Sequence, residues 1–234
     1  MSNNSQHAYI LHQRPYTDSR LLIDLFTENS GLVRVVGRVP AKRQTGAIQS
    51  FQRMHVEYWG TSFLKTLRTC ESAATATALL GDSLYCGMYV NELLERLLPP
   101  EEACCDLFHF YEAVIIQLAQ SQARLEQEAV LRHFEFFLLE HLGYAAIVDV
   151  CAETAAEVRA GQFYFFEAGS GLRQCSPDLP SSNTVNMMAG EQLLAMSRRE
   201  FRDPGVLKSA KFITRQALRH LLGQKPLKSK ELFR

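Results

Sequence analysis

The sequence predicts an α+β protein, with a small five-stranded barrel first and a helical region after it. Two observations support this class. Apolar residues recur with a period of two up to about residue 76, and with a period near 3.6 after about residue 78. The chain has 234 residues, 47% of them hydrophobic, which is enough for one large or two small domains. We therefore expect one domain at 1–78 and a second at 79–234.

Five short strands make up the predicted barrel, at 9–11, 21–26, 31–39, 51–59 and 64–70. The third strand organises this half of the chain. Its Val33 and Val35 face one side while Arg34 and Arg38 face the other, because successive side chains of a strand alternate. Pro40 cannot donate to a sheet ladder, so it is expected to end the strand and lead into a basic loop.

Five amphipathic helices are predicted after the barrel: one that follows a cap at Asp82 or Ser83 and runs to Leu97, and four at about 102–120, 126–142, 190–198 and 205–222. Asp82 or Ser83 is expected to cap the first, and the first three indicate a bundle because short breaks separate them. Between 147 and 185 the pattern weakens. There, 163–166 and 172–174 predict a small hairpin, and 176–183 a loop.

Charge is divided unevenly along the chain although its formal net value is zero. Residues 1–78, 79–170 and 171–234 carry net charges of +4, −11 and +7. Two basic ends around an acidic middle favour a polyanionic partner for the ends. The predicted strands also mix arginine with aromatic residues on their outer faces, which is typical of proteins that bind single-stranded nucleic acid. An ordinary solvated surface is the alternative interpretation.

A basic stripe is predicted on the last helix. Lys208, Lys211, Arg215 and Arg219 are spaced by 3, 4 and 4 residues, which places them on one side of a helix whose other side is apolar. Such a stripe is commonly only a solvated face. Its agreement with the basic N-terminal half favours a role in binding.

No catalytic motif is present. The sequence contains no phosphate-binding Gly-rich loop, no Gly-x-Ser-x-Gly and no His-Glu-x-x-His, so we predict no catalytic residues and no enzyme. Cys151 and Cys175 flank the predicted hairpin as the halves of a zinc ribbon would. Each half needs two ligands a few residues apart. The third residue after Cys151 is Thr154 and the third after Cys175 is Asp178, so neither cysteine has a second one beside it, and we predict no metal and no cofactor. No apolar run reaches the roughly 18 residues of a membrane helix, and a cytoplasmic location is expected.

Four segments carry a resemblance to a known family: Gly31-Leu-Val-Arg34, Tyr89-Val-Asn-Glu-Leu-Leu94, Leu131-Arg-His-Phe-Glu135 with His141-Leu-Gly-Tyr144, and Lys225-Pro-Leu-Lys-Ser-Lys-Glu-Leu-Phe233. In this order they resemble the bacterial RecO family of DNA repair proteins. The resemblance implies an N-terminal OB-fold barrel and a helical domain in which 147–185 is a zinc-ribbon region. Only Cys151 and Cys175 remain here of four family ligands.

The resemblance also implies a function. Members bind single- and double-stranded DNA, anneal complementary strands, and act with RecR to help RecA replace single-strand-binding protein, whose acidic C-terminal tail they recognise. The implied partners are thus DNA, that tail, RecR and, indirectly, RecA, at the nucleoid and not at a membrane. A protein-interaction adaptor, whose basic surfaces grip acidic proteins and not DNA, is the alternative.

Candidate binding residues follow from their positions. The expected phosphate contacts of the barrel are Arg34, Arg38, Lys42, Arg43, Arg53, Lys65 and Arg68. Trp59, and more weakly Phe51, are candidates for base stacking, although Trp59 fits a packing role equally well. The stripe formed by Lys208, Lys211, Arg215 and Arg219 is expected to extend the DNA path or receive an acidic tail. Arg132, beside Phe136 and Leu139, is the candidate site for the single-strand-binding-protein tail, since such a peptide needs an apolar groove with a cationic rim.

Overall fold

The computed structural model describes the chain except for residues 1–3, 39–49, 76, 168, 176–186 and 234. Two compact units are present: Met1–Ser121 together with Pro226–Arg234, and Gln122–Lys225. The first unit therefore contains the barrel, the first two helices and the C-terminal segment. The expected domain boundary after residue 78 does not coincide with this division by compactness and stays a prediction.

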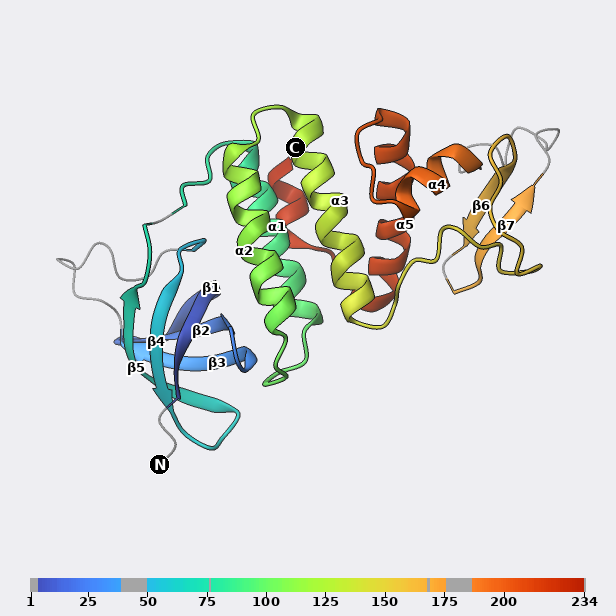
Figure 1. The fold of residues 1–234 in the computed structure, drawn as a ribbon. Helices are drawn as coiled ribbons and strands as arrows, with labels where there is room; N and C mark the ends of the chain where they lie inside the picture. The colour runs from blue at the N-terminus through green and yellow to red at the C-terminus, as the bar shows by residue number, and fades with distance from the viewer. Residues whose placement is uncertain (1–3, 39–49, 76, 168, 176–186, 234) are drawn as a thin grey trace. The chain divides into compact units, whose positions relative to one another are not determined.

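The first unit contains the predicted barrel (Figure 1). Its strands are β1 (Asn4–Thr17), β2 (Arg20–Thr27), β3 (Gly31–Arg38), β4 (Met54–Trp59) and β5 (Leu64–Ser72). They close in the order β1-β2-β3-β5-β4, with β3 and β5 parallel and the other pairs antiparallel. The α+β class with a five-stranded barrel is confirmed. Strand β1 is longer than predicted, and β4 starts later, at Met54 and not at 51.

The barrel interior is apolar because alternate residues of each strand point inward. Ile23, Leu25, Val33 and Val35 are at most 1% exposed. Burying one such side chain stabilises the fold by roughly 1.5–3 kcal/mol. Their neighbours in sequence therefore point outward, and this outer side carries Arg34, whereas Lys65 of β5 is the buried register partner of Val35.

Helices α1 (Asp82–Leu97) and α2 (Cys105–Gln120) complete the first unit. The rings of Tyr9 and Phe26 on the barrel lie 4.9–5.8 Å from those of Phe108 and Tyr111 on α2, in edge-on or tilted arrangements that favour aromatic pairs. Aromatic packing thus fixes α2 against β1 and β2.

The start of α1 differs from the expectation. Gly81, and not Asp82 or Ser83, is its N-cap residue, and Ser83 instead donates its hydroxyl to the Leu118 carbonyl oxygen on α2. At the other end of the chain the 3₁₀ helix η2 (Lys228–Phe233) lies on α1. Glu92 accepts hydrogen bonds there from the Ser229 hydroxyl and from two backbone N–H groups.

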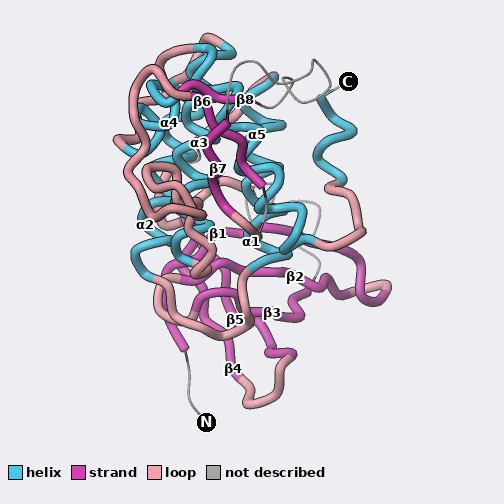
Figure 2. The backbone as a smooth tube through the Cα atoms, turned by 90° about the vertical axis from the view of Figure 1, so that its right-hand side faces the viewer, coloured by secondary structure: helices cyan, strands magenta, loops and turns pink. Residues whose placement is uncertain are grey.

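The second unit combines three helices with a small sheet, whose strands are visible in Figure 2. The helices are α3 (Arg124–His141), α4 (Gly190–Ser197) and α5 (Pro204–Leu222), and the sheet order is β7 (Gly171–Cys175), β6 (Phe163–Glu167), β8 (Met187–Ala189). The predicted hairpin is confirmed as β6 and β7, and β8 is an unpredicted third strand. The expected loop at 176–183 lies outside the described residues. No helix in the described ranges has the length and apolar character needed to span a membrane.

Candidate nucleic-acid interface

A row of paired residues crosses the outer side of the barrel. Strand register places Trp59 opposite Thr66, Thr66 opposite Val36, Val36 opposite Leu22 and Leu22 opposite Arg14. The two ends of the row and Thr66 are exposed, while the two aliphatic residues are buried. The register therefore places a cation of β1 and the exposed indole of β4 on the outer side of the barrel, at the two ends of this row.

Two arginines face each other at the end of this surface. Arg20 at the start of β2 lies directly opposite Arg38 at the end of β3, and both are exposed. Within the described ranges neither forms an ion pair. Like charges directly opposite on paired strands destabilise the sheet. An anionic ligand would remove that cost, so the arrangement favours phosphate binding.

Exposed aromatic rings accompany these cations. Tyr16, Trp59 and Phe63 are 52%, 43% and 55% exposed. Tyr16 lies beside the β1–β2 turn, and Phe63 lies between β4 and β5, which are the two connections that OB-type barrels use to bind oligonucleotides. We call the six residues the barrel face: Arg14, Tyr16, Arg20, Arg38, Trp59 and Phe63. Sequence reasoning missed four of them, since only strand register shows where Arg14, Tyr16, Arg20 and Phe63 lie.

Arg34 of β3 is bound by a carboxylate of the neighbouring strand β2. Its Nε donates to Asp24 Oδ1 at 2.6 Å, and its guanidinium lies 5.6 Å from the centre of the Phe63 ring. The Asp24 side chain is only 1% exposed. Arg34 therefore orients a buried carboxylate and an exposed ring at the edge of the barrel face.

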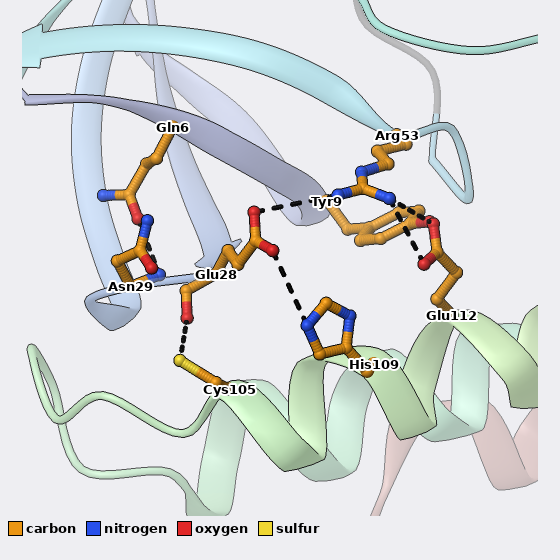
Figure 3. A network of polar contacts seen from close by, with 8 residues as sticks. All are labelled: Gln6, Tyr9, Glu28, Asn29, Arg53, Cys105, His109 and Glu112. Carbon is orange, nitrogen blue, oxygen red and sulfur yellow. Dashed lines mark hydrogen bonds and ion pairs between the residues drawn. The ribbon is translucent and has the colours of Figure 1, made fainter.

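Arg53 and Lys65 lie inside ion-pair networks. Figure 3 shows Arg53 between Glu28 and Glu112, at 3.7 and 3.2 Å. Lys65, whose side chain is 7% exposed, lies 2.7 Å from Glu101. Both cations were predicted as phosphate contacts, but in the structure they join the barrel to α2 and to the segment after α1.

The network around Arg53 also perturbs a tyrosine. The Tyr9 hydroxyl donates to Glu112 at 2.7 Å, and burial together with this hydrogen bond raises the pKa of Tyr9 far above its ordinary value. On the other side, the His109 ring lies 3.6 Å from Glu28 (Figure 3). These contacts fasten α2 to the barrel.

The remaining barrel candidates divide into three cases. Arg68 is 63% exposed, and its one ion pair among the described residues is a long one, 3.9 Å to Glu57, so it stays a candidate phosphate contact. Phe51 was wrongly predicted as a stacking platform: it is 5% exposed, with a φ of 63°, and it packs toward Gly87 of α1. Lys42 and Arg43 lie outside the described residues.

Helix α5 carries the predicted basic stripe, with one change. Lys208, Arg215 and Arg219 are exposed. Lys211 instead binds Glu128 of α3 at 2.9 Å, and this contact, against the cost of burial, lowers the pKa of the glutamate. Three cations are therefore available on the second unit, and the fourth connects two of its helices.

The three residues predicted to receive the partner tail are buried. Arg132, Phe136 and Leu139 are 3%, 1% and 0% exposed, so the expected open groove with a cationic rim is wrong for this structure. Arg132 Nη2 lies 2.5 Å from Glu135 Oε1, whose other oxygen accepts from the Thr214 hydroxyl of α5. The helical period could not show that Arg132 pairs with Glu135 or that Thr214 of α5 packs against that carboxylate.

Cys151 and Cys175 belong to the sheet region of the second unit. Cys175 is the last residue of β7, and the backbone of Cys151 forms an isolated β-bridge with Leu172 of the same strand. All six cysteines are free. The expected lack of zinc between these two stays a prediction.

Comparison with known proteins gives concordant matches over the whole chain. Residues 1–76 match the family model "Recombination protein O N terminal", and residues 81–231 match "Recombination protein O C terminal". The chain is 42% identical over 233 residues to the DNA repair protein RecO of Erwinia tasmaniensis, covering 98% of this chain and 92% of that relative. It is 40% identical over 232 residues to the proteins of the same name from Shigella boydii and Escherichia coli, covering 98% of this chain and 93% of each.

Proposed function

Because the chain belongs to the RecO family of DNA repair proteins, we propose that it is a recombination mediator that binds and anneals single-stranded DNA. With RecR, it would help to load RecA onto DNA coated by single-strand-binding protein. The observation that carries the proposal is the barrel face, where Arg20 and Arg38 oppose each other beside exposed aromatic rings. Its site of action would be the nucleoid in the cytoplasm, and double-stranded DNA would be a second ligand.

The barrel face suits sequence-independent binding. Arginines contact phosphates without reading base edges, and rings of tyrosine, tryptophan and phenylalanine stack on any base. Annealing of complementary strands is downhill, so it needs no bond cleavage and no catalytic residue. A protein that neutralises phosphates on both strands lowers the repulsion between them, which is the main barrier to their encounter. We therefore propose that the protein is not an enzyme.

The residues proposed to bind the partner tail are buried in the second unit. Arg132 Nε and Nη1 are buried without hydrogen-bond partners among the described residues. Those two N–H groups could satisfy a carboxylate only if α5 moved away from α3. We propose that the acidic tail of single-strand-binding protein binds here through such an opening, with Phe136 and Leu139 as apolar contacts.

A double substitution tests the barrel face. Arg20→Gln with Arg38→Gln removes two phosphate contacts, so the slope of log K against log salt for single-stranded DNA should become shallower by about 1.4. Arg124→Gln, which removes an 82% exposed cation from the second unit, is the matched control and should leave the slope unchanged. Removing two opposed like charges should not destabilise the barrel, so loss of folding would not confuse the result.

The fluorescence of a tryptophan in the barrel face can report DNA binding in this test. Trp59 is the one tryptophan of the sequence and is 43% exposed, so base stacking on it would quench its fluorescence. An unchanged salt slope in the double variant would refute the barrel face as the DNA site. Absence of any steep salt dependence in the unaltered protein would favour the adaptor alternative, since only a polyelectrolyte releases condensed counterions.

Annealing assays then separate DNA binding from mediation. Complementary oligonucleotides are mixed bare and coated with the cognate single-strand-binding protein. Acceleration on both, weakened in the arginine double variant, is the expected result. Acceleration on bare strands alone would contradict the tail interaction while leaving the DNA interface in place.

A further inference from the structure

Three potential metal ligands converge on the outer side of the barrel in the first unit. His12 of β1, Asp24 of β2 and Glu95 of α1 place their ligand atoms within 4.8 Å of one another. His12 Nδ1 is 3.9 Å from Asp24 Oδ2 and 4.0 Å from Glu95 Oε1. These residues are far apart in the sequence, so no spacing motif announces them.

Two atoms at the centre of this cluster lack partners. Asp24 Oδ2 and His12 Nδ1 are buried and form no hydrogen bond with the described part of the chain. The Asp24 side chain is 1% exposed. A buried carboxylate oxygen without a partner is costly, and native proteins normally satisfy such atoms with a donor, a water or an ion. The two unsatisfied atoms are 3.9 Å apart, and His12 Nδ1 lies 4.0 Å from Glu95 Oε1.

We propose that His12, Asp24 and Glu95 bind a divalent transition-metal ion, with Zn²⁺ as the ion of best fit. One imidazole nitrogen and two carboxylate oxygens are ligands that zinc accepts, and a fourth position would hold water. In a tetrahedral site the ligand atoms lie about 3.3–3.6 Å apart, given metal–ligand bonds of roughly 2.0–2.2 Å. His12 Nδ1 lies 3.9 and 4.0 Å from the two carboxylates and all three ligand atoms lie within 4.8 Å of one another, so the side chains must close in on the ion when it binds.

The backbone holds these ligands in place before any ion arrives. His12 and Asp24 are direct partners in the β1–β2 ladder, so their side chains leave the sheet on the same face. One turn before Glu95, Asn91 donates its side-chain N–H to the Leu11 carbonyl oxygen at 3.2 Å, which anchors α1 beside His12. The ion would join two strands to a helix within one compact unit.

Arg34 gives the site an outer shell. It donates to Asp24 Oδ1 and leaves Oδ2 free, as partners of metal-bound carboxylates commonly do. Two carboxylates, one guanidinium and a neutral imidazole leave a net charge near −1, which favours a divalent cation. The site goes beyond the proposed function.

Zinc titration of the full, metal-free chain is the test. Calorimetry should find one ion bound at this site, with an affinity that falls more than tenfold in His12→Gln and in Glu95→Gln, since even outer-shell partners contribute tenfold or more. His109→Gln is the matched control, because His109 also faces a single carboxylate, that of Glu28, and lies outside the cluster. Saturation with zinc should raise the melting temperature by roughly 5–10 °C at a hundredfold excess over Kd.

Cobalt distinguishes this site from the six free cysteines. Co²⁺ bound by nitrogen and oxygen ligands lacks the intense thiolate charge-transfer bands, and its spectrum should disappear in His12→Gln and persist in His109→Gln. The proposal is wrong if the chain binds no zinc, if thiolate bands accompany all the binding, or if both ligand variants bind as the unaltered protein does. Asp24 is left unchanged because its loss would also release Arg34.

Discussion

The buried pair of Arg132 and Glu135 makes a sharp prediction about stability. Their charged atoms are 2.5 Å apart, and the side chains are 4% and 1% exposed. Replacing Arg132 with Met removes the guanidinium from the buried Glu135 carboxylate, which also accepts from the Thr214 hydroxyl. Breaking a buried pair in this way typically costs about 3–5 kcal/mol, because one charge remains uncompensated.

Removing both charges should cost much less. In the double variant Arg132→Met with Glu135→Leu no buried charge remains, and such replacements are often neutral. The Thr214 hydroxyl loses its acceptor, which adds about 1–3 kcal/mol. The two substitutions should therefore be coupled by at least about 2 kcal/mol. Urea unfolding of the four proteins of this double-mutant cycle at neutral pH measures the coupling.

Two results would refute this reasoning. Additivity of the single effects within about 0.5 kcal/mol would mean that the pair does not interact. A double variant as unstable as Arg132→Met would place the cost in lost packing and not in charge. The double variant also serves the tail proposal, since it lacks the guanidinium without leaving a buried charge: undiminished tail-peptide binding to it would exclude Arg132 as a contact.

Two further predictions concern the first unit. Gly31→Ala should destabilise it by about 2–4 kcal/mol in urea unfolding, because the residue has a φ of 62° and a Cβ there would lie 1.9 Å from the Glu102 carbonyl oxygen. Gly81→Ala, in the same unit with a φ of 55° and open space, should cost less, and equal costs would contradict the close-approach argument. Burial opposes ionisation of Glu92, but its hydrogen bonds from Ser229 and Lys228 outweigh burial and lower the pKa of the carboxyl. The stability that it contributes is therefore present above the ordinary glutamate pKa and lost as pH falls through the lowered value, so the protection of the η2 amides, measured against their intrinsic exchange rates at each pH, should fall in acid, and Glu92→Gln should remove that acid dependence.

The sequence was sufficient for the barrel because alternation along β3 places Val33 and Val35 on one side and Arg34 and Arg38 on the other, although most residues of β2 and β3 are buried. The same alternation could not show which outward cations stay free. Arg53 and Lys65 are neutralised by Glu112 and Glu101, which come from helical and loop segments 59 and 36 residues away. Periodicity is a local property, whereas ion pairing depends on tertiary packing.

Register explains the rest of the difference at the candidate site. The opposition of Arg20 and Arg38 depends on the turn between β2 and β3, where Gly31 has a positive φ. Reading each strand separately identified Arg38 but gave no reason to choose Arg20. The metal cluster was missed for the same reason, since the pairing of His12 with Asp24 exists only once β1 and β2 are aligned.

The return of the chain to its first unit sets an order of assembly during synthesis. Ribosomes produce Pro226–Arg234 after the whole of Gln122–Lys225, yet the segment packs with Met1–Ser121. Until the second unit has been made, the surface of the first unit that Leu227 and Ser229 later cover is therefore exposed to water. N-terminal units usually fold first on the ribosome. Here the first unit to begin folding is the last to be finished.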